Sequence, residues 1–161
     1  MATPRKIPKN QKIPKPNQKP KPKLESKSRI KNRLLKLWRD KVRLLNRYRC
    51  AVCGDADRIL DAHHIEPKEL CPALRYDPRN GILLTKSHHK FGKDSFHRSP
   101  VWAAEWLKAH RPKQYQYVLD HRQDVVDLDD RETLANIEKA LRTPPTPEEL
   151  EIFEDGCEGC G

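Results

Sequence analysis

Apolar side chains recur at helical spacing in the segment 29–49. They stand three or four residues apart, at Ile30, Leu34, Leu37, Trp38, Val42 and Leu45. This periodicity predicts an amphipathic helix that buries one face on a small core, while Arg and Lys fill the other face. Ser28 stands directly before the segment and is the expected N-cap.

The apolar runs become short after a tight turn at residues 50–54. Residues 59–66 and 82–84 are predicted strands, and an irregular, proline-containing connection with the turn signal Asn80-Gly81 separates them. Residues 87–93 are predicted to form a short helix. The expected local order is therefore strand, loop, strand, helix.

Further helices are predicted toward the C-terminus, at residues 101–110, 115–121 and 131–141. Arg111-Pro112 is expected to end the first of these helices before the second begins. From Thr143 onward the chain is rich in Pro and Glu, and we expect this tail to be mostly disordered. The pattern as a whole predicts an α+β fold: a small core of strands, a preceding basic helix, following helices and disordered tails.

Charge is distributed unevenly along the 161 residues. The net charge is +15 over residues 1–60, +4 over 61–119 and −9 over 120–161. With the helical pattern, this distribution predicts a disordered Lys/Pro-rich tail (1–28), a central domain (29–122) and an acidic C-terminal helix and tail (123–161). The basic first part of the chain, residues 1–60, indicates a polyanionic partner such as nucleic acid. The tail 1–28 and the helix 29–49 would contact its phosphates without reading its sequence.

The sequence contains no apolar run long enough to span a membrane, and its basic N-terminus lacks the apolar stretch of a secretory signal. We therefore expect a cytoplasmic protein with no membrane partner. Four of the five Cys form two Cys-x-x-Cys pairs, Cys50/Cys53 and Cys157/Cys160. Without an export signal, such pairs favour metal binding or free thiols over disulfides.

Four of the seven His lie in one window, together with an Asn-Gly turn. They are the pairs His63-His64 and His88-His89, on either side of Asn80. Imidazole both binds divalent metals and titrates near neutral pH, and clustered His suits metal-assisted hydrolysis.

These residues resemble the motif of the HNH endonucleases, the ββα-metal or His-metal finger superfamily, in its bacterial and phage forms. The matching stretches are Cys50-x-x-Cys53-Gly54, Leu60-x-x-His63-His64-Ile65-x-Pro67, Asp77-x-x-Asn80-Gly81-x-x-Leu84 and His88-His89. The resemblance runs from about Trp38 to Trp106, under half of the chain. It implies a metal-dependent endonuclease that hydrolyses DNA phosphodiester bonds in a bacterial host or for a phage.

The resemblance also implies a role for each matching residue. His64 would be the general base that activates water, and His63 and His89 would hold one divalent metal. Asn80 would tie the loop together and fix the backbone that orients His64. Mg²⁺ is the expected ion, although imidazole ligands also suit Mn²⁺, Ni²⁺ or Zn²⁺. Because neighbouring residues of an ideal strand point to opposite faces, His63 and His64 can share a site only where the strand is bulged, twisted or ending.

A structural zinc site is a second expectation, with Cys50, Cys53 and His88 as ligands. Many similar proteins have two further Cys where this chain has Thr85 and His88, so the four-Cys pattern is incomplete. Cys71 or His97 could supply the fourth ligand that tetrahedral zinc needs, or the pair Cys157/Cys160 could dock to make a four-Cys site. His97 could instead be a third ligand of the catalytic metal.

Two alternatives to a nuclease stay open at this point. A non-catalytic nucleic-acid-binding zinc module could keep the HNH-like fold without cleaving, and a purely structural zinc protein could mediate protein contacts. The complete set of His64, Asn80 and His89 favours the nuclease, and the basic first part of the chain speaks against the last alternative. Target sequence, nicking or double-strand cleavage, and monomer or dimer are left open.

Overall fold

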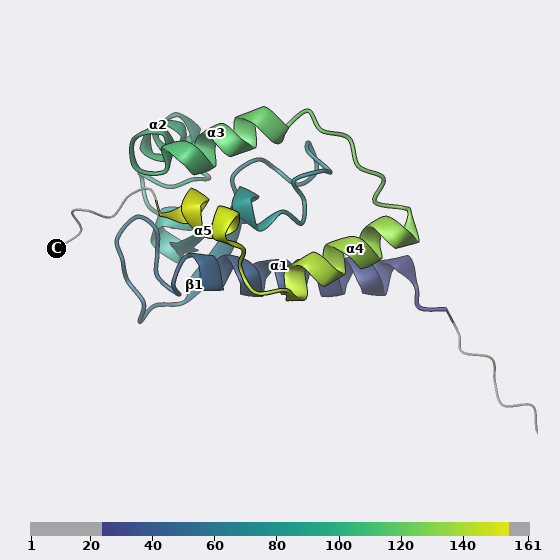
Figure 1. Cartoon of the computed structure of the whole chain (residues 1–161). Helices are drawn as coiled ribbons and strands as arrows, with labels where there is room; N and C mark the ends of the chain where they lie inside the picture. The colour runs from purple at the N-terminus through teal and green to yellow at the C-terminus, as the bar shows by residue number, and fades with distance from the viewer. Residues whose placement is uncertain (1–23, 155–161) are drawn as a thin grey trace, which may run out of the picture.

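The computed structural model describes residues 24–154, in which helices surround a small sheet (Figure 1). In chain order the elements are α1 Lys27–Leu45, β1 Leu60–His64, η1 Pro78–Asn80, β2 Gly81–Thr85, η2 Ser87–Phe91, α2 Pro100–His110, α3 Pro112–His121, α4 Arg131–Arg142 and α5 Pro147–Phe153. The fold is α+β, as the sequence predicts. Residues 1–23, most of the predicted basic tail, lie outside the described residues.

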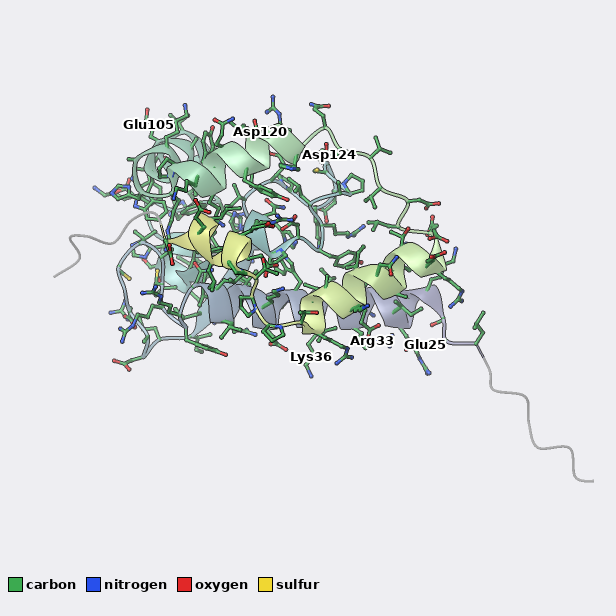
Figure 2. The ribbon with its side chains drawn as sticks, in the orientation of Figure 1. Glu25, Arg33, Lys36, Glu105, Asp120 and Asp124 are labelled. Carbon is green, nitrogen blue, oxygen red and sulfur yellow. The ribbon has the colours of Figure 1, made fainter. Side chains whose placement is uncertain are left out.

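Helix α1 begins slightly earlier than its apolar pattern indicates. Its N-cap is Ser26, whose hydroxyl accepts a hydrogen bond from the Arg29 amide (3.4 Å). The prediction of Ser28 as the cap is therefore wrong. Arg33 helps to hold this earlier start in place, because it binds the Glu25 carboxylate just before the cap (2.6 Å) (Figure 2). The rest of the helix buries the expected apolar face, including Leu34, Trp38, Val42 and Leu45.

Strands β1 and β2 form an antiparallel pair in which Leu60 lies opposite Thr85 and His64 lies opposite Gly81. Every residue of β2 is buried, because it lies between two apolar clusters. One cluster is built on Leu34, Trp38 and Val42 of α1 together with Leu134 and Leu141 of α4. The other joins Ile82 and Leu84 of β2 to Phe96 and to Ala103 and Leu107 of α2, with Trp102 and Trp106 packed against it. The sheet therefore separates the α1 side of the molecule from the α2 side.

The short helix after β2 is a single π-helical turn, η2, closed by a hydrogen bond from the Gly92 amide to the Ser87 carbonyl (2.8 Å). Turns of this kind are rare and frequently occur at functional sites. Helix α3 begins at Pro112, three residues before the predicted start. Proline is well suited to the first helical position, where its missing N–H would have no intrahelical partner.

The expectation of disorder after Thr143 is wrong for residues 147–153, which form α5. Thr146 and Glu149 cap the helix reciprocally, and Pro147 is its first residue. Tertiary contacts hold α5 in place: Lys41 of α1 binds Glu149 (2.9 Å), and Arg111 donates to the Phe153 carbonyl (2.9 Å). Apolar periodicity cannot reveal so short a helix, because these partners lie far away in the sequence. Cys157 and Cys160 lie outside the described residues.

Helices α1 and α4 run side by side along one edge of the molecule, and α2 and α3 lie at the opposite edge (Figure 1). The acidic C-terminal part thus packs directly on the basic helix. Within residues 24–154, none of the helices has the length and apolar character that crossing a membrane requires.

Gly81, at the start of β2, allows α1 to approach the sheet closely. A Cβ atom at this position would collide with the Val42 side chain and would lie 3.0 Å from Trp38 Cζ2. Both neighbours belong to the buried core and cannot move aside freely.

We predict that Gly81→Ala lowers the free energy of unfolding by about 1–3 kcal/mol through overpacking. Urea denaturation measures this change. The matched control is Gly54→Ala, where a Cβ atom meets no atom within 4 Å but the φ angle is +71°. That control should lose only about 1 kcal/mol from backbone strain. A loss well below about 1 kcal/mol for Gly81→Ala would contradict the close approach of α1.

Candidate functional site

Three imidazoles meet beside the sheet: His63 from β1, His89 from η2, and His97 from the segment before α2. Their candidate ligand nitrogens lie within 4.8 Å of one another, and the Nε2 atoms of His89 and His97 are 3.2 Å apart. The His63 ring lies 5.0 Å from the His89 ring and 4.9 Å from the His97 ring, centroid to centroid. This group, His63/His89/His97, is called the three-His cluster below.

Backbone pairing explains why residues eight positions apart come together. The Phe96 amide donates to the His88 carbonyl (2.9 Å), and the His97 amide donates to the His89 carbonyl (3.1 Å). Phe96 anchors this loop, because its ring is buried and packs edge-on against Trp102 and Trp106. The packing of Phe96 thereby sets the position of His97, the next residue in the chain.

The three-His cluster is suited to a cation with imidazole ligands. Burial, together with smaller effects of the neighbouring imidazoles and Lys90, lowers the pKa of His63 to about 3. Burial also lowers the pKa of His89, although the hydrogen bond to Asp61 opposes this effect. Both rings are therefore neutral at pH 7 and offer lone pairs, as metal ligands must. The residues present thus fit a divalent metal.

His64 lies in a different environment from His63. Its ring stacks on Trp38 of α1 at 3.8 Å between centroids, with the two planes 3° apart. Its Nε2 lies 2.9 Å from the Arg75 carbonyl oxygen. Since a carbonyl only accepts, Nε2 carries the hydrogen and Nδ1 is left to take up a proton. Burial lowers the pKa of His64, so this nitrogen is free at neutral pH.

The two neighbouring imidazoles leave β1 on opposite faces. His63 points to the three-His cluster, and His64 points to α1, in the regular alternation of a strand. The pairing is regular through His64, the last residue of β1, so the strand is not bulged here but ends. The strand end at His64 does not turn the two rings to one face, so His64 is the neighbour of the three-His cluster along the chain while its ring faces α1.

Asn80 is fully buried and joins the two ends of the loop between the strands. Its Oδ1 accepts from the Glu66 amide (2.8 Å), and its Nδ2 donates to the Glu66 carbonyl (2.9 Å) and the Leu74 carbonyl (3.1 Å). Leu74 precedes Arg75, whose carbonyl binds His64. The Asn80 amide thus holds the backbone on which the tautomer of His64 depends.

Cys50, Cys53 and His88 form a second group, separate from the three-His cluster. Their candidate ligand atoms also lie within 4.8 Å of one another, with Cys50 Sγ 3.5 Å from His88 Nδ1. Thr85 also contacts this group, since its Oγ1 lies 3.0 Å from His88 Nδ1 and 3.9 Å from Cys50 Sγ. Burial and the neighbouring Cys50 raise the pKa of Cys53, an effect that a bound cation would reverse.

Two of the suggested fourth ligands do not lie at this group. Cys71 packs in a separate cluster with Leu74 and Val118, and its thiol points toward the His121 carbonyl (3.8 Å). His97 belongs to the three-His cluster. Neither position follows from the sequence, because both residues are placed by contacts with distant helices and loops.

Sequence reasoning assigned no role to three contributors to the site. They are Trp38, which stacks on His64; the Arg75 carbonyl; and Asp61, whose Oδ2 lies 3.2 Å from His89 Nδ1. For Asp61 a signal was present, since residues two apart on a strand share a face and Asp61 precedes His63 by two. No sequence signal identifies the other two contacts.

Comparison with protein families matched residues 50–96 to the model described as HNH endonuclease. The matched segment contains both groups, apart from His97, which follows it directly. Comparison with curated proteins and with solved structures gave no match.

Burial of several imidazoles predicts an acid-sensitive fold. The pKa values of His63, His64, His88 and His89 all lie below 6.5 in the folded chain. As the pH falls below 6.5, the unfolded chain binds protons that the folded chain does not, so the free energy of unfolding decreases. His63 alone should contribute a slope of up to about 1.4 kcal/mol per pH unit between roughly pH 6 and its own low pKa.

Urea denaturation of chelator-treated protein between pH 7.5 and 4 measures this slope. The variant His63→Gln should have a shallower slope than the wild type below pH 6. Equal slopes would contradict the neutral, buried state of His63.

Proposed function

We propose that the chain is a metal-dependent nuclease that hydrolyses DNA phosphodiester bonds, as the match of residues 50–96 to the HNH endonuclease model suggests. The observation that carries this proposal is the convergence of His63, His89 and His97 from three separate segments. Their arrangement beside β1, with the candidate base His64 as the next residue, supports hydrolysis rather than a purely structural site. The proposal of DNA as the substrate rests on the match of residues 50–96 to the HNH endonuclease model and on the net positive charge of residues 1–60.

We assign His63 and His89 as ligands of one divalent metal and add His97 as the third. Such an ion, when bound, would stabilise negative charge that develops on the phosphate and the leaving oxygen. Three neutral imidazoles suit Mn²⁺, Ni²⁺ or Zn²⁺ better than Mg²⁺, which prefers oxygen ligands. The addition of His97 therefore shifts our expectation from Mg²⁺ to a transition metal.

We assign His64 as the general base. Its Nε2–H is held by the Arg75 carbonyl, which orients the ring and leaves Nδ1 as the atom that takes the proton from water. The low pKa keeps the ring neutral, so it is ready to accept a proton at pH 7. Asn80 is a positioning residue in this scheme, because it holds the loop that carries Arg75.

Basic side chains surround the site and would bind DNA phosphates. Three exposed basic residues lie on and after η2: Lys90 follows His89, Arg98 follows His97, and Lys93 lies between them in the sequence. Lys90 is near enough to lower the pKa of His63 and His89, and Lys68 has the same effect on His64. Contacts of this kind position a nucleic acid without reading its sequence. The tail 1–28 would add further phosphate contacts.

We propose a structural zinc ion at Cys50, Cys53 and His88. Two thiols and an imidazole are a donor set that zinc prefers, and water or a further side chain would complete the tetrahedron. The reduced thiols that this site needs also favour a cytoplasmic location.

A binding module without cleavage is the second candidate function. One observation favours it: the His64 ring faces α1 and not the three-His cluster. In that case the metal sites would only stabilise the fold, and the basic residues would hold nucleic acid. The two functions differ in whether His64 matters for the chemistry.

We predict that the wild type nicks or linearises supercoiled plasmid with Mn²⁺, Ni²⁺ or Zn²⁺, and that EDTA abolishes this activity. His64→Ala should reduce the cleavage rate by about 10²- to 10⁴-fold, because the general base is lost. Fluorescence anisotropy with a labelled duplex should show nearly unchanged DNA binding.

The matched control is His110→Ala, which removes an exposed imidazole from α2, outside both metal groups. It should cleave like the wild type. Wild-type activity in His64→Ala would refute the base assignment. Tight binding without cleavage by the wild type under every metal would favour the binding module.

We predict that Cys53→Ser binds one zinc ion fewer per chain than the wild type, and that its melting temperature is lower. Elemental analysis of purified protein and thermal denaturation measure the two effects. Cys71→Ala is the control, since Cys71 lies in another cluster and should leave the zinc content unchanged. A zinc content that does not differ between wild type and Cys53→Ser would exclude this site.

A further inference from the structure

Strand alternation places a carboxylate beside the three-His cluster. Asp61 and His63 are two residues apart on β1 and therefore project from the same face. Both contact His89 on η2: the Asp61 Oδ2 lies 3.2 Å from His89 Nδ1, and the His63 and His89 rings meet edge to face. Strand β1 thus supplies His63 as a candidate metal ligand and Asp61 as a hydrogen-bond partner for His89, a second candidate ligand.

We propose that Asp61 is a positioning residue that holds His89 with its Nε2 lone pair directed at the metal. This role rests on the proposed function, because it presumes a metal at the three-His cluster. It goes beyond that function by assigning a residue that sets how tightly the metal is held.

The chemistry of the two groups fixes the tautomer. An ionised carboxylate has no hydrogen to donate, and a neutral imidazole has one N–H. The hydrogen of His89 must therefore be on Nδ1, the atom that faces Asp61. The lone pair is then on Nε2, the atom that lies 3.2 Å from His97 Nε2.

Because His89 is buried, Asp61 and not solvent accepts the hydrogen bond from its Nδ1. The His89 side chain is 10% exposed, whereas that of Asp61 is 40% exposed. Within the described part of the chain, Asp61 is the hydrogen-bond partner found for Nδ1. The outer side of the Asp61 carboxylate stays accessible to water while its Oδ2 holds the buried ring.

Direct coordination by Asp61 does not fit the geometry. Its Oδ2 is at the Nδ1 side of the ring, and the three-His cluster is at the Nε2 side. Asp61 is also not among the residues whose ligand atoms converge there. It therefore acts through His89, in the manner of carboxylate–histidine–metal arrangements, where loss of the outer carboxylate weakens metal binding by about 10- to 100-fold.

The test is the Mn²⁺ affinity of the full chain after removal of metals by chelation. Mn²⁺ is chosen because thiolates bind it weakly, so Cys50 and Cys53 do not compete. The electron paramagnetic resonance signal of free Mn²⁺ gives the Kd. We expect Asp61→Asn to raise the Kd by about 10-fold or more, while circular dichroism and the melting temperature stay those of the wild type.

The matched control is Asp94→Asn, which removes the same charge from the loop between His89 and His97 without a contact to either ring. The role of Asp61 is supported if its substitution raises the Kd at least tenfold more than that control does, and overturned if the difference is smaller. Should Asp61→Asn prove unstable, Asp61→Glu decides instead. Near-wild-type affinity in that variant supports the role of the carboxylate, and a loss beyond tenfold overturns it.

A double-variant comparison separates positioning from direct coordination. In a His89→Ala background, Asp61→Asn should not weaken Mn²⁺ binding further, because the ring through which it acts is gone. A further tenfold loss would overturn the positioning role. If the wild type itself binds no Mn²⁺, the proposed metal site fails; if the wild type binds and Asp61→Asn binds equally well, only the present inference fails.

Discussion

The close approach of α1 to Gly81 is the contact on which the rest of the site depends. Because this residue has no side chain, Trp38 and Val42 can pack directly against the start of β2. Trp38 then stacks on His64 and donates its Nε1–H to the Asp77 carbonyl (2.9 Å). One buried ring thus joins a helix, the end of β1 and the loop before β2. The position of the candidate base follows from core packing as much as from its own strand.

A polar counterpart to this contact lies in the loop between the strands. Asn80 bonds to the backbone at Glu66 and at Leu74, so the loop cannot move relative to the strands without breaking buried hydrogen bonds. The Arg75 carbonyl, next to Leu74, is thereby kept in reach of His64. An amide is suited to this position because it does not titrate, so the hydrogen bonds of Asn80 to the backbone do not depend on a protonation state of its own. Packing orients one face of His64, and this network orients its edge.

The acidic C-terminal part reduces the charge that α1 presents to solvent. Arg33 forms two hydrogen bonds with Glu138 (3.0 and 2.9 Å), Lys31 binds Asp129 (2.9 Å), and Lys41 binds Glu149. The Lys41–Glu149 pair is nearly buried, with 5% and 13% of the two side chains exposed. Lys36 and Arg39 stay exposed, and Lys36 points away from the molecule (Figure 2). A phosphate partner would therefore meet a smaller basic surface on α1 than the count of Lys and Arg implies.

The sequence by itself determined the elements and the residues that could carry chemistry. Apolar spacing identified α1, both strands and the helices at residues 100–142, because local periodicity reflects which face of an element is buried. The pairs His63-His64 and His88-His89 around Asn80 indicated a resemblance to the HNH endonucleases, and the family model of that description matches residues 50–96.

Only the tertiary structure decided which of these residues meet. It separated His63 from His64 across the strand, brought His97 to His89 through a loop anchored by Phe96, and kept Cys71 away from Cys50 and Cys53. It also formed α5 where composition predicted disorder, since its stabilising partners Lys41 and Arg111 lie far away in the sequence. Spacing along a chain reports neighbours on one element, whereas these contacts join different elements and depend on how their buried surfaces pack.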